Sequence, residues 1–340
     1  MSEAAEASRR SADSHDEPAV SVRGLVKRFG EVEAVRGVDF DVHVGETFGF
    51  LGPNGAGKST TIGMLCTLVP PTGGTARVAG FDVVRERDDV RRNIGLVFQD
   101  PTLDSYLSAE QNLKFHAELY GVPKQLVPER MRQVLEMVGL WERRASKVST
   151  FSGGMRRRLE IARGLLHSPR VLFLDEPTVG LDPQTRASIW RYIHELKKVE
   201  EITIFLTTHY MDEAEAADRI AIMDRGQVIV LDTPEALKAS VGKDRVQLQT
   251  DDNAATIEAL KARFGLEATV SEGAVTVAVE GGEQFVPRLF AELGMPIRGV
   301  SVSRPSLDDV FMSYTGTTIR DAETGAPGMD PMARMMRRGR

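Results

Sequence analysis

The chain has 340 residues, of which 41% are apolar and 27% charged, and its formal net charge is −6. These values predict a soluble globular protein of about two domains, without an overall attraction to nucleic acid or to anionic lipid. The single cysteine, Cys66, excludes an internal disulfide and a cysteine-rich zinc site. No segment approaches the roughly 18 uninterrupted apolar residues that span a bilayer, so any membrane role is expected to depend on a partner.

Residues 1–17 are polar and charged, lack the basic-then-apolar order of a secretory signal, and are expected to be disordered in a cytoplasmic protein. Alternating apolar residues from Val20 to Val44 predict short antiparallel strands joined across Arg28-Phe29-Gly30. Phe29 precedes a glycine-rich loop by about twenty residues, where an aromatic ring can stack on a nucleotide base. Core packing is an equally good interpretation of this ring.

That glycine-rich loop follows the pattern G-x-x-x-x-G-K-[S/T]. In such a loop the glycines let backbone N–H groups surround phosphates, Lys58 reaches the β/γ oxygens and Ser59 ligates Mg²⁺. The apolar run 47–51 predicts a buried strand before the loop, and residues 60–68 predict a helix whose N-terminal dipole faces the anion. The expected phosphate-binding residues are Gly52, Pro53, Asn54, Gly55, Ala56, Gly57, Lys58, Ser59 and Thr60.

The middle of the chain predicts a helical insertion between strands. Residues 92–100 are expected to form a strand that ends in polar side chains, among them Gln99. Residues 101–150 then become helical, with a capping box formed by Ser108 and Gln111. A second helix carries apolar residues at helical spacing around Leu135. The expected helical subdomain covers about residues 101–168.

Two further stretches carry residues suited to phosphate chemistry. Ser152, Gly153 and Gly154 open a helix, which indicates either a phosphate-binding helix end or a simple helix cap. The buried strand 171–175 ends in the adjacent acids Asp175 and Glu176, at the sheet edge where ligands of open parallel sheets bind. Asp175 suits a Mg²⁺ ligand, directly or through water, and Glu176 suits a general base for an attacking water.

A third strand is expected at residues 202–206, after a helix near 185–198. It runs into Thr207-Thr208-His209, so His209 also lies at the C-terminal end of a strand. We interpret His209 as a candidate catalytic residue and the other five histidines as surface or core residues.

Together these motifs resemble the ATP-binding subunits of ABC transporters over roughly residues 18–235. In the resemblance Phe29 takes the adenine-stacking place, and Asp182 takes the place of the D-loop residue at the nucleotide. The other matches are Gly52 to Ser59 (Walker A), Gln99 (Q-loop), Ser152-Gly153-Gly154 (signature), Asp175-Glu176 (Walker B) and His209 (switch histidine).

The resemblance implies an α/β fold, a P-loop NTPase of ABC ATPase type with a helical subdomain, that hydrolyses ATP with Mg²⁺. It implies that two copies sandwich two ATP molecules, each held by Walker A of one copy and the signature of the other. It places Gln99 with Ser59 and Asp175 at the metal, and Gln99, His209, Lys58 and Glu176 in catalysis. It also implies separately encoded transmembrane permease subunits, with a contact just after Gln99 near residues 100–106.

This sequence departs from the family pattern at two motifs. The usual adenine-stacking tyrosine is Phe29, which keeps the ring and loses the hydroxyl. The usual Leu and Gln of the signature are Phe151 and Met155, which removes one polar side chain while the serine and the backbone amides remain. No motif indicates a site that has lost hydrolysis.

The last third of the chain predicts a separate small α+β domain. Its order of strands and helices, β-α-β-β-α-β with one more helix, is the ferredoxin-like arrangement. Without a cluster of His, Cys or paired acids, it is expected to support structure or dimerisation. Residues 305–316, and the run Met155-Arg156-Arg157-Arg158, resemble the drug-resistance, daunorubicin-type branch of bacterial exporter ATPases. The Met- and Arg-rich tail 317–340 is expected to be disordered, with contact to a partner or membrane as the alternative.

The expected organisation is a disordered segment 1–17, an ABC ATPase domain 18–236, an accessory domain 237–316 and the tail. The expected function is to power export of a hydrophobic drug or lipid-like compound from the cytoplasmic face of the membrane. Two alternatives remain open. A soluble ABC ATPase acting on nucleic acid, of the repair, chromosome or translation-factor type, would carry long heptad repeats, zinc cysteines or two motif sets, so no nucleic-acid partner is expected. Only the C-terminal domain argues against an ABC importer.

Overall fold

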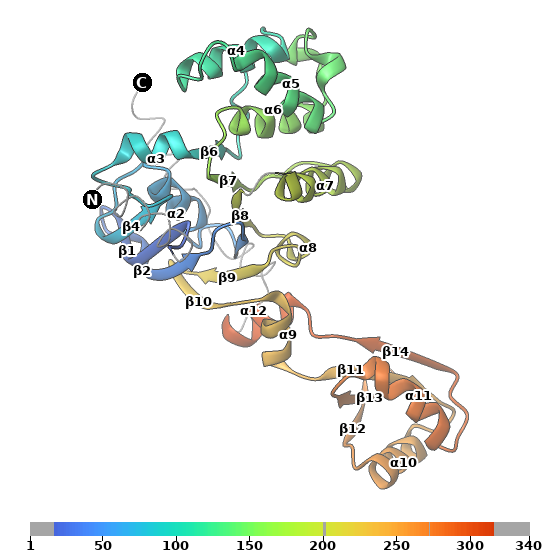
Figure 1. Cartoon of the computed structure of the whole chain (residues 1–340). Coiled ribbons are helices and arrows are strands. Elements are labelled where there is room, and N and C mark those ends of the chain that lie inside the picture. Colours follow the sequence, from blue (N-terminus) through green and yellow to red (C-terminus); the bar gives the residue numbers. More distant parts are fainter. Residues whose placement is uncertain (1–16, 200–201, 272, 316–340) are drawn as a thin grey trace, which may run out of the picture. The chain divides into compact units, whose positions relative to one another are not determined.

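The computed structural model describes residues 17–199, 202–271 and 273–315 (Figure 1). The chain separates into two compact units, the first ending at Leu231 and the second beginning at Asp232. The tail expected at 317–340, and all but Glu17 of the N-terminal segment, lie outside the described residues. No helix in the described ranges is both long and apolar enough to pass through a bilayer.

A six-stranded sheet with the order β10-β9-β3-β8-β7-β6 forms the centre of the first unit. The strands from β9 to β6 are parallel to their neighbours, so their carboxyl ends meet at one edge of the sheet. Its strands are β3 (Thr47–Leu51), β6 (Ile94–Val97), β7 (Val171–Asp175), β8 (Thr203–Thr208), β9 (Arg219–Asp224) and β10 (Gln227–Asp232).

The central strands are buried on both faces, which explains their continuous apolar runs. Successive side chains of a strand point to opposite faces. In β7, Val171 and Phe173 therefore enter one core cluster, while Leu172 and Leu174 enter the other. Burial on both sides is the usual state of a parallel sheet.

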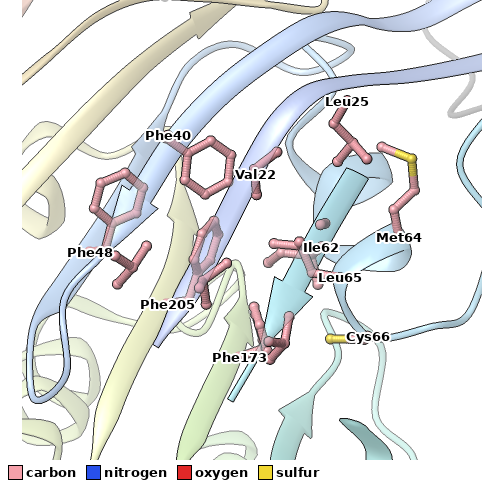
Figure 2. Packing of buried hydrophobic residues seen from close by; sticks show 14 of the residues in the cluster. Val22, Leu25, Phe40, Phe48, Ile62, Met64, Leu65, Cys66, Phe173 and Phe205 are labelled. Atoms are coloured by element: carbon pink, nitrogen blue, oxygen red, sulfur yellow. The ribbon is translucent and has the colours of Figure 1, made fainter. Parts of the chain in front are cut away.

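One face of the central sheet packs against a second, antiparallel sheet with the order β2-β1-β4-β5 and against helices α2 and α3. Figure 2 shows this core, where the rings of Phe40 and Phe48 stack with centroids 5.6 Å apart and Phe205 follows at 5.4 Å from Phe48. These elements are β1 (Val20–Phe29), β2 (Val32–Val42), α2 (Lys58–Leu65), β4 (Gly73–Val78), β5 (Phe81–Asp82) and α3 (Arg87–Asn93).

The opposite face is covered by helices that include the predicted helical insertion (Figure 1). The capping box at the start of α4 is confirmed, because the Ser108 side chain accepts from the Gln111 N–H and the Gln111 side chain accepts from the Ser108 N–H. The elements are α4 (Ala109–Leu119), α5 (Val127–Met137), 3₁₀ turns at Trp141–Arg143 and Val148–Thr150, α6 (Gly153–Leu165) and α7 (Pro183–Val199); a short α8 (Met211–Ala214) follows β8.

Two predicted boundaries were wrong. The strand expected over residues 92–100 is shortened to β6, because its first two residues complete helix α3, whose acidic first turn and basic last turn both complement the helix dipole. The helix after the glycine-rich loop starts at Lys58 rather than Thr60 and stops at Leu65, and Thr67 then adopts a left-handed backbone conformation with φ of 60°.

The second unit has the predicted ferredoxin-like order of elements, and its sheet has the antiparallel order β12-β13-β11-β14. Its own core is built around Val246, Leu260 and Leu289. Helix α9, which was not predicted from the sequence, packs against α12. The elements are α9 (Pro234–Val241), β11 (Asp244–Gln249), α10 (Asn253–Phe264), β12 (Ala268–Ser271), β13 (Ala274–Val279), α11 (Gly282–Glu292), β14 (Gly299–Ser303) and α12 (Leu307–Thr315).

Candidate active site

The glycine-rich loop joins β3 to α2 at the carboxyl edge of the central sheet. A Cβ at Gly52 would lie 2.2 Å from the carbonyl oxygen of Met223, so only glycine fits there. Gly57 has φ of 104°, and a Cβ on it would lie 2.6 Å from the carbonyl oxygen of Ala34. Two of the glycines in the motif are therefore required by backbone packing as well as by the loop's conformation.

Lys58 is buried inside this loop, with 4% of its surface exposed. Its ammonium donates to the carbonyl oxygens of Gly52 at 2.6 Å and Pro53 at 3.0 Å, and it lies 3.6 Å from Oε1 of Glu176. The first helical residue thus places a positive charge between the loop and a carboxylate. Such a charge is suited to the oxygens of a phosphate group.

Ser59 and Asp175 come together although they are 116 positions apart in the sequence. The Ser59 hydroxyl donates to Oδ1 of Asp175 at 3.1 Å, and the Thr207 hydroxyl donates to the same oxygen at 2.6 Å. Burial raises the pKa of Asp175, and the two hydroxyl groups oppose that rise. A hydroxyl and a carboxylate oxygen at one point are ligands that Mg²⁺ accepts.

Glu176 is buried with 7% of its surface exposed, and its carboxylate faces two basic groups. Its Oε1 lies 3.4 Å from Nδ1 of His209 and 3.6 Å from Nζ of Lys58. Burial alone would raise the pKa of Glu176, but the contacts with His209 and Lys58 outweigh burial and lower it. Glu176 is therefore held ionised, in the state that accepts a proton.

The signature and the D-loop form a second group. Ser152 is the N-cap of α6 and accepts the Met155 N–H at 3.2 Å. A Cβ at Gly154 would lie 2.3 Å from the methyl carbon of Thr185, so any larger residue would have to displace that side chain. Asp182 accepts from the Thr185 N–H at 3.0 Å and from its hydroxyl at 2.6 Å, and these bonds lower the pKa of Asp182.

The remaining predicted residues, Phe29 and Gln99, lie at strand ends. Gln99 is exposed two residues beyond the end of β6, which pairs with β7. The half-buried ring of Phe29 ends β1, and Nζ of Lys27 lies over it at 4.8 Å from the centroid. This cation–π contact holds the ring in place.

Thr207 belongs to none of the predicted motifs, but its hydroxyl contacts both acidic residues. Its hydroxyl donates to Asp175 and accepts the Glu176 N–H at 3.0 Å. The available signal was a run of threonines closing an otherwise apolar buried strand. A fully buried hydroxyl needs a partner, and here the partner is the site itself.

The parallel sheet, the phosphate loop and the paired acids define a P-loop nucleotide-hydrolysing protein. Residues 35–179 match the ABC transporter family, and residues 233–315 match the family described as ATP-binding protein DrrA1-3-like, C-terminal domain. The chain belongs to the ABC transporter ATP-binding proteins, which confirms the family predicted from its motifs, and it is an ATPase.

Individual relatives agree with this assignment. The chain is 41% identical over 315 residues to the daunorubicin/doxorubicin resistance ATP-binding protein DrrA of Streptomyces peucetius, covering 90% of this chain and 95% of that protein. Among solved structures, cbiO1 from Clostridium perfringens matches with a TM-score of 0.62 and 30% identity, over 66% of this chain and 92% of that one. The dimeric ATP-binding cassette MJ0796, bound to ADP and Pi, matches with a TM-score of 0.57 and 28% identity, over 63% and 98%.

Proposed function

We propose that this chain is the ATP-hydrolysing subunit of a bacterial exporter that moves a hydrophobic drug or lipid-like compound through separately encoded membrane subunits. One observation carries the proposal. The similarity to a drug-resistance ATP-binding protein runs through both units of the chain, including the accessory unit at residues 233–315. An ATPase domain alone would support only the wider family.

In this proposal the buried cluster around Glu176 performs the hydrolysis. Lys58 and backbone N–H groups of the glycine-rich loop hold the β and γ phosphates of ATP. Glu176, ionised by its two basic neighbours, accepts a proton from the water that attacks the γ-phosphate. His209 orients the Glu176 carboxylate from its position 3.4 Å away, and Gln99 follows the end of β6, the strand that pairs with β7. The ring of Phe29 stacks on adenine.

The residues present also fit Mg²⁺. The Ser59 hydroxyl and the Asp175 carboxylate already share one point, and Gln99 can add an amide oxygen. Bound there, Mg²⁺ would neutralise charge that develops on the phosphate oxygens. The described residues contain no group of three or more His, Cys, Asp or Glu that could hold a metal alone. That agrees with Mg²⁺, which is usually held by one or two carboxylates together with substrate phosphates.

The signature residues act on the nucleotide of a second copy. Ser152 and Gly153 are exposed at the N-terminus of α6, where N–H groups are available to an anion, and Gly154 packs against Thr185 of α7, which hydrogen-bonds to Asp182. The relative MJ0796 was solved as a dimer with ADP and Pi. We therefore assign two copies of this chain to one working unit, docked on permease subunits at the cytoplasmic face of the membrane.

The experiment compares what stimulates ATP turnover. The chain is assayed alone, with the membrane protein encoded beside it in lipid vesicles, and with duplex DNA or RNA. Under the proposal the membrane protein changes the rate and nucleic acid does not, and vesicles bearing both proteins accumulate daunorubicin only when ATP is supplied. A rate that rises with DNA or RNA and ignores the membrane protein would favour the soluble nucleic-acid ATPases instead.

A further inference from the structure

Arg157 lies on α6 in the arginine run that follows the signature, and it is buried with 7% of its surface exposed. A guanidinium has five N–H donors and no acceptor. Here all five donors are used, four on backbone carbonyl groups and one on a carboxylate. Nε donates to the Pro177 carbonyl at 2.5 Å, Nη1 to the Phe98 carbonyl and to Glu160 Oε2 at 3.1 Å, and Nη2 to the carbonyls of Asp175 at 3.1 Å and Glu176 at 3.2 Å.

These acceptors belong to segments that the proposed chemistry needs together. Phe98 is the residue before Gln99, and the other three carbonyl groups are consecutive at the exit of β7. Glu160, one turn along α6 and only 2% exposed, balances the buried charge, and its other oxygen accepts the Thr102 N–H at 2.7 Å. One side chain thus joins the signature helix to the Q-loop and to the Walker B acids.

The backbone of Glu176 shows why such a hold is needed. Its φ of 44° lies in the left-handed region, which is unfavourable for a glutamate and persists only where neighbours fix it. Both of its backbone polar groups are fixed: the N–H donates to Thr207 and the carbonyl accepts from Arg157. This conformation gives the Glu176 carboxylate its place beside Lys58 and His209.

We propose that Arg157 is a positioning residue for ATP hydrolysis, which holds the strained backbone of Glu176 and locks it to the Q-loop and the signature helix. This inference rests on the proposed role of Glu176 as general base. Arg157 itself has no contact with the reacting atoms in this arrangement, so its loss lowers turnover without weakening the hold on ATP. Its effect is therefore on kcat rather than on KM.

The first test is Arg157→Lys, which keeps the charge opposite Glu160 but replaces a five-donor fork by one ammonium. We expect kcat to fall about tenfold or more, because small misplacements of a reacting group cost up to about 100-fold. KM for ATP and the affinity for a labelled nucleotide stay near the wild-type values. The matched control is Arg158→Lys, since Arg158 donates instead to the Val138 carbonyl and the Tyr192 hydroxyl. It keeps wild-type kcat.

A second variant separates positioning from stability. Replacing both partners, in Arg157→Met with Glu160→Met, removes the buried ion pair as a unit, a change that is often neutral or stabilising. We expect this double variant to melt cooperatively at a lowered Tm, because buried carbonyl groups lose their donor, to keep the wild-type nucleotide affinity and to retain the low kcat. Wild-type kcat in Arg157→Lys, or in the folded double variant, would overturn the inference.

Glu176→Gln, measured in parallel, separates the role of Glu176 as general base from the positioning role of Arg157. If Glu176→Gln is slow while Arg157→Lys turns over normally, the general base stands and the positioning role falls. If Glu176→Gln hydrolyses ATP at the wild-type rate, the general base is wrong, and the role of Arg157 toward it falls as well.

Discussion

The hydroxyl of Ser59 and the carboxylate of Asp175 meet at 3.1 Å although 116 positions separate them in the chain. The parallel pairing of β7, β8 and β3 brings the two together at one sheet edge. Both side chains are half-buried, and the Thr207 hydroxyl donates to the same Asp175 oxygen at 2.6 Å. The Ser59 hydroxyl oxygen and an Asp175 carboxylate oxygen are thus placed together as candidate ligands of Mg²⁺.

The first prediction concerns Asp175→Asn. The amide keeps the shape and loses the charge, so we expect the Mg²⁺ concentration needed for half-maximal turnover to rise and the maximal rate to fall by about 100-fold, since a bound metal supplies several kcal/mol of transition-state stabilisation. ATPase rates across a Mg²⁺ titration measure both effects. Asp41→Asn, at the surface pair with Arg23, is the control and keeps the wild-type profile. An unchanged titration in Asp175→Asn would place the metal elsewhere.

The second prediction places the permease contact near Tyr106, whose side chain is 84% exposed. Cys66 is buried, so a Tyr106→Cys variant offers one accessible thiol to a cross-linker. We expect it to cross-link to a co-expressed membrane subunit. The comparison variant is Phe290→Cys, at a 55% exposed position in the second unit. Cross-links from position 290 alone would show that the second unit, rather than the segment after Gln99, meets the membrane subunit.

Local motifs were predictable because each one ties a residue type to a strand end or a helix start. Lys58, Ser59, Asp175 and Glu176 follow from short patterns, and the parallel-sheet rule explains why they meet. The ferredoxin-like order of the second unit also followed from alternation and turns. These features depend on a few neighbouring residues.

Other features depend on contacts between distant segments. Thr207 reaches Asp175 because β7 and β8 pair with these two residues opposite each other, and no pattern within either strand specifies that register. The left-handed backbone of Glu176 occurs without glycine, so the usual signal is missing. Helix α3 includes the first two residues of the predicted strand, and its acidic first turn and basic last turn complement the helix dipole.

The third prediction is that the second unit carries no chemistry. Lys58, Asp175 and Glu176 all lie in the first unit, and each unit has its own apolar core. A chain shortened to end at Asp232, the last residue of β10, should therefore bind ATP like the full chain while losing transport or the self-association that occurs without ATP. A labelled ATP analogue measures nucleotide binding, and light scattering without nucleotide measures self-association. Loss of nucleotide binding in a shortened chain with a cooperative melting transition would contradict the prediction.

The fourth prediction concerns acid stability. Burial lowers the pKa of His116 from 6.5 to about 3, and electrostatic repulsion from Arg163 and His167 adds to this effect. The ring of the neighbouring His167 stacks on Tyr120, with the centroids 4.1 Å apart. Between these values the unfolded chain binds a proton that the folded chain does not, so stability present above pH 6.5 is lost as the pH falls. The expected loss is on the order of 1–2 kcal/mol at pH 5.

Urea unfolding at pH 7 and pH 5 measures this loss, and His116→Gln should reduce it because the amide does not titrate. His194→Gln, at an exposed histidine on α7, is the matched control and should keep the wild-type difference between the two pH values. The same difference in His116→Gln as in the wild type would mean that other groups cause the acid sensitivity.

The last prediction separates loss of hydrolysis from loss of nucleotide binding. Glu176→Gln keeps the shape of the side chain but cannot accept the proton, so turnover should fall by roughly 10²–10⁴-fold while ATP still binds and holds two copies together. Lys58→Ala should also stop turnover, but it should stay monomeric, because ATP no longer bridges the phosphate loop and Ser152 of a second copy. Size-exclusion chromatography with ATP and Mg²⁺ distinguishes the two variants, using the chain that ends at Asp232 if the second unit dimerises unaided. If Glu176→Gln keeps the wild-type rate, the base lies elsewhere, and His209 becomes the next candidate.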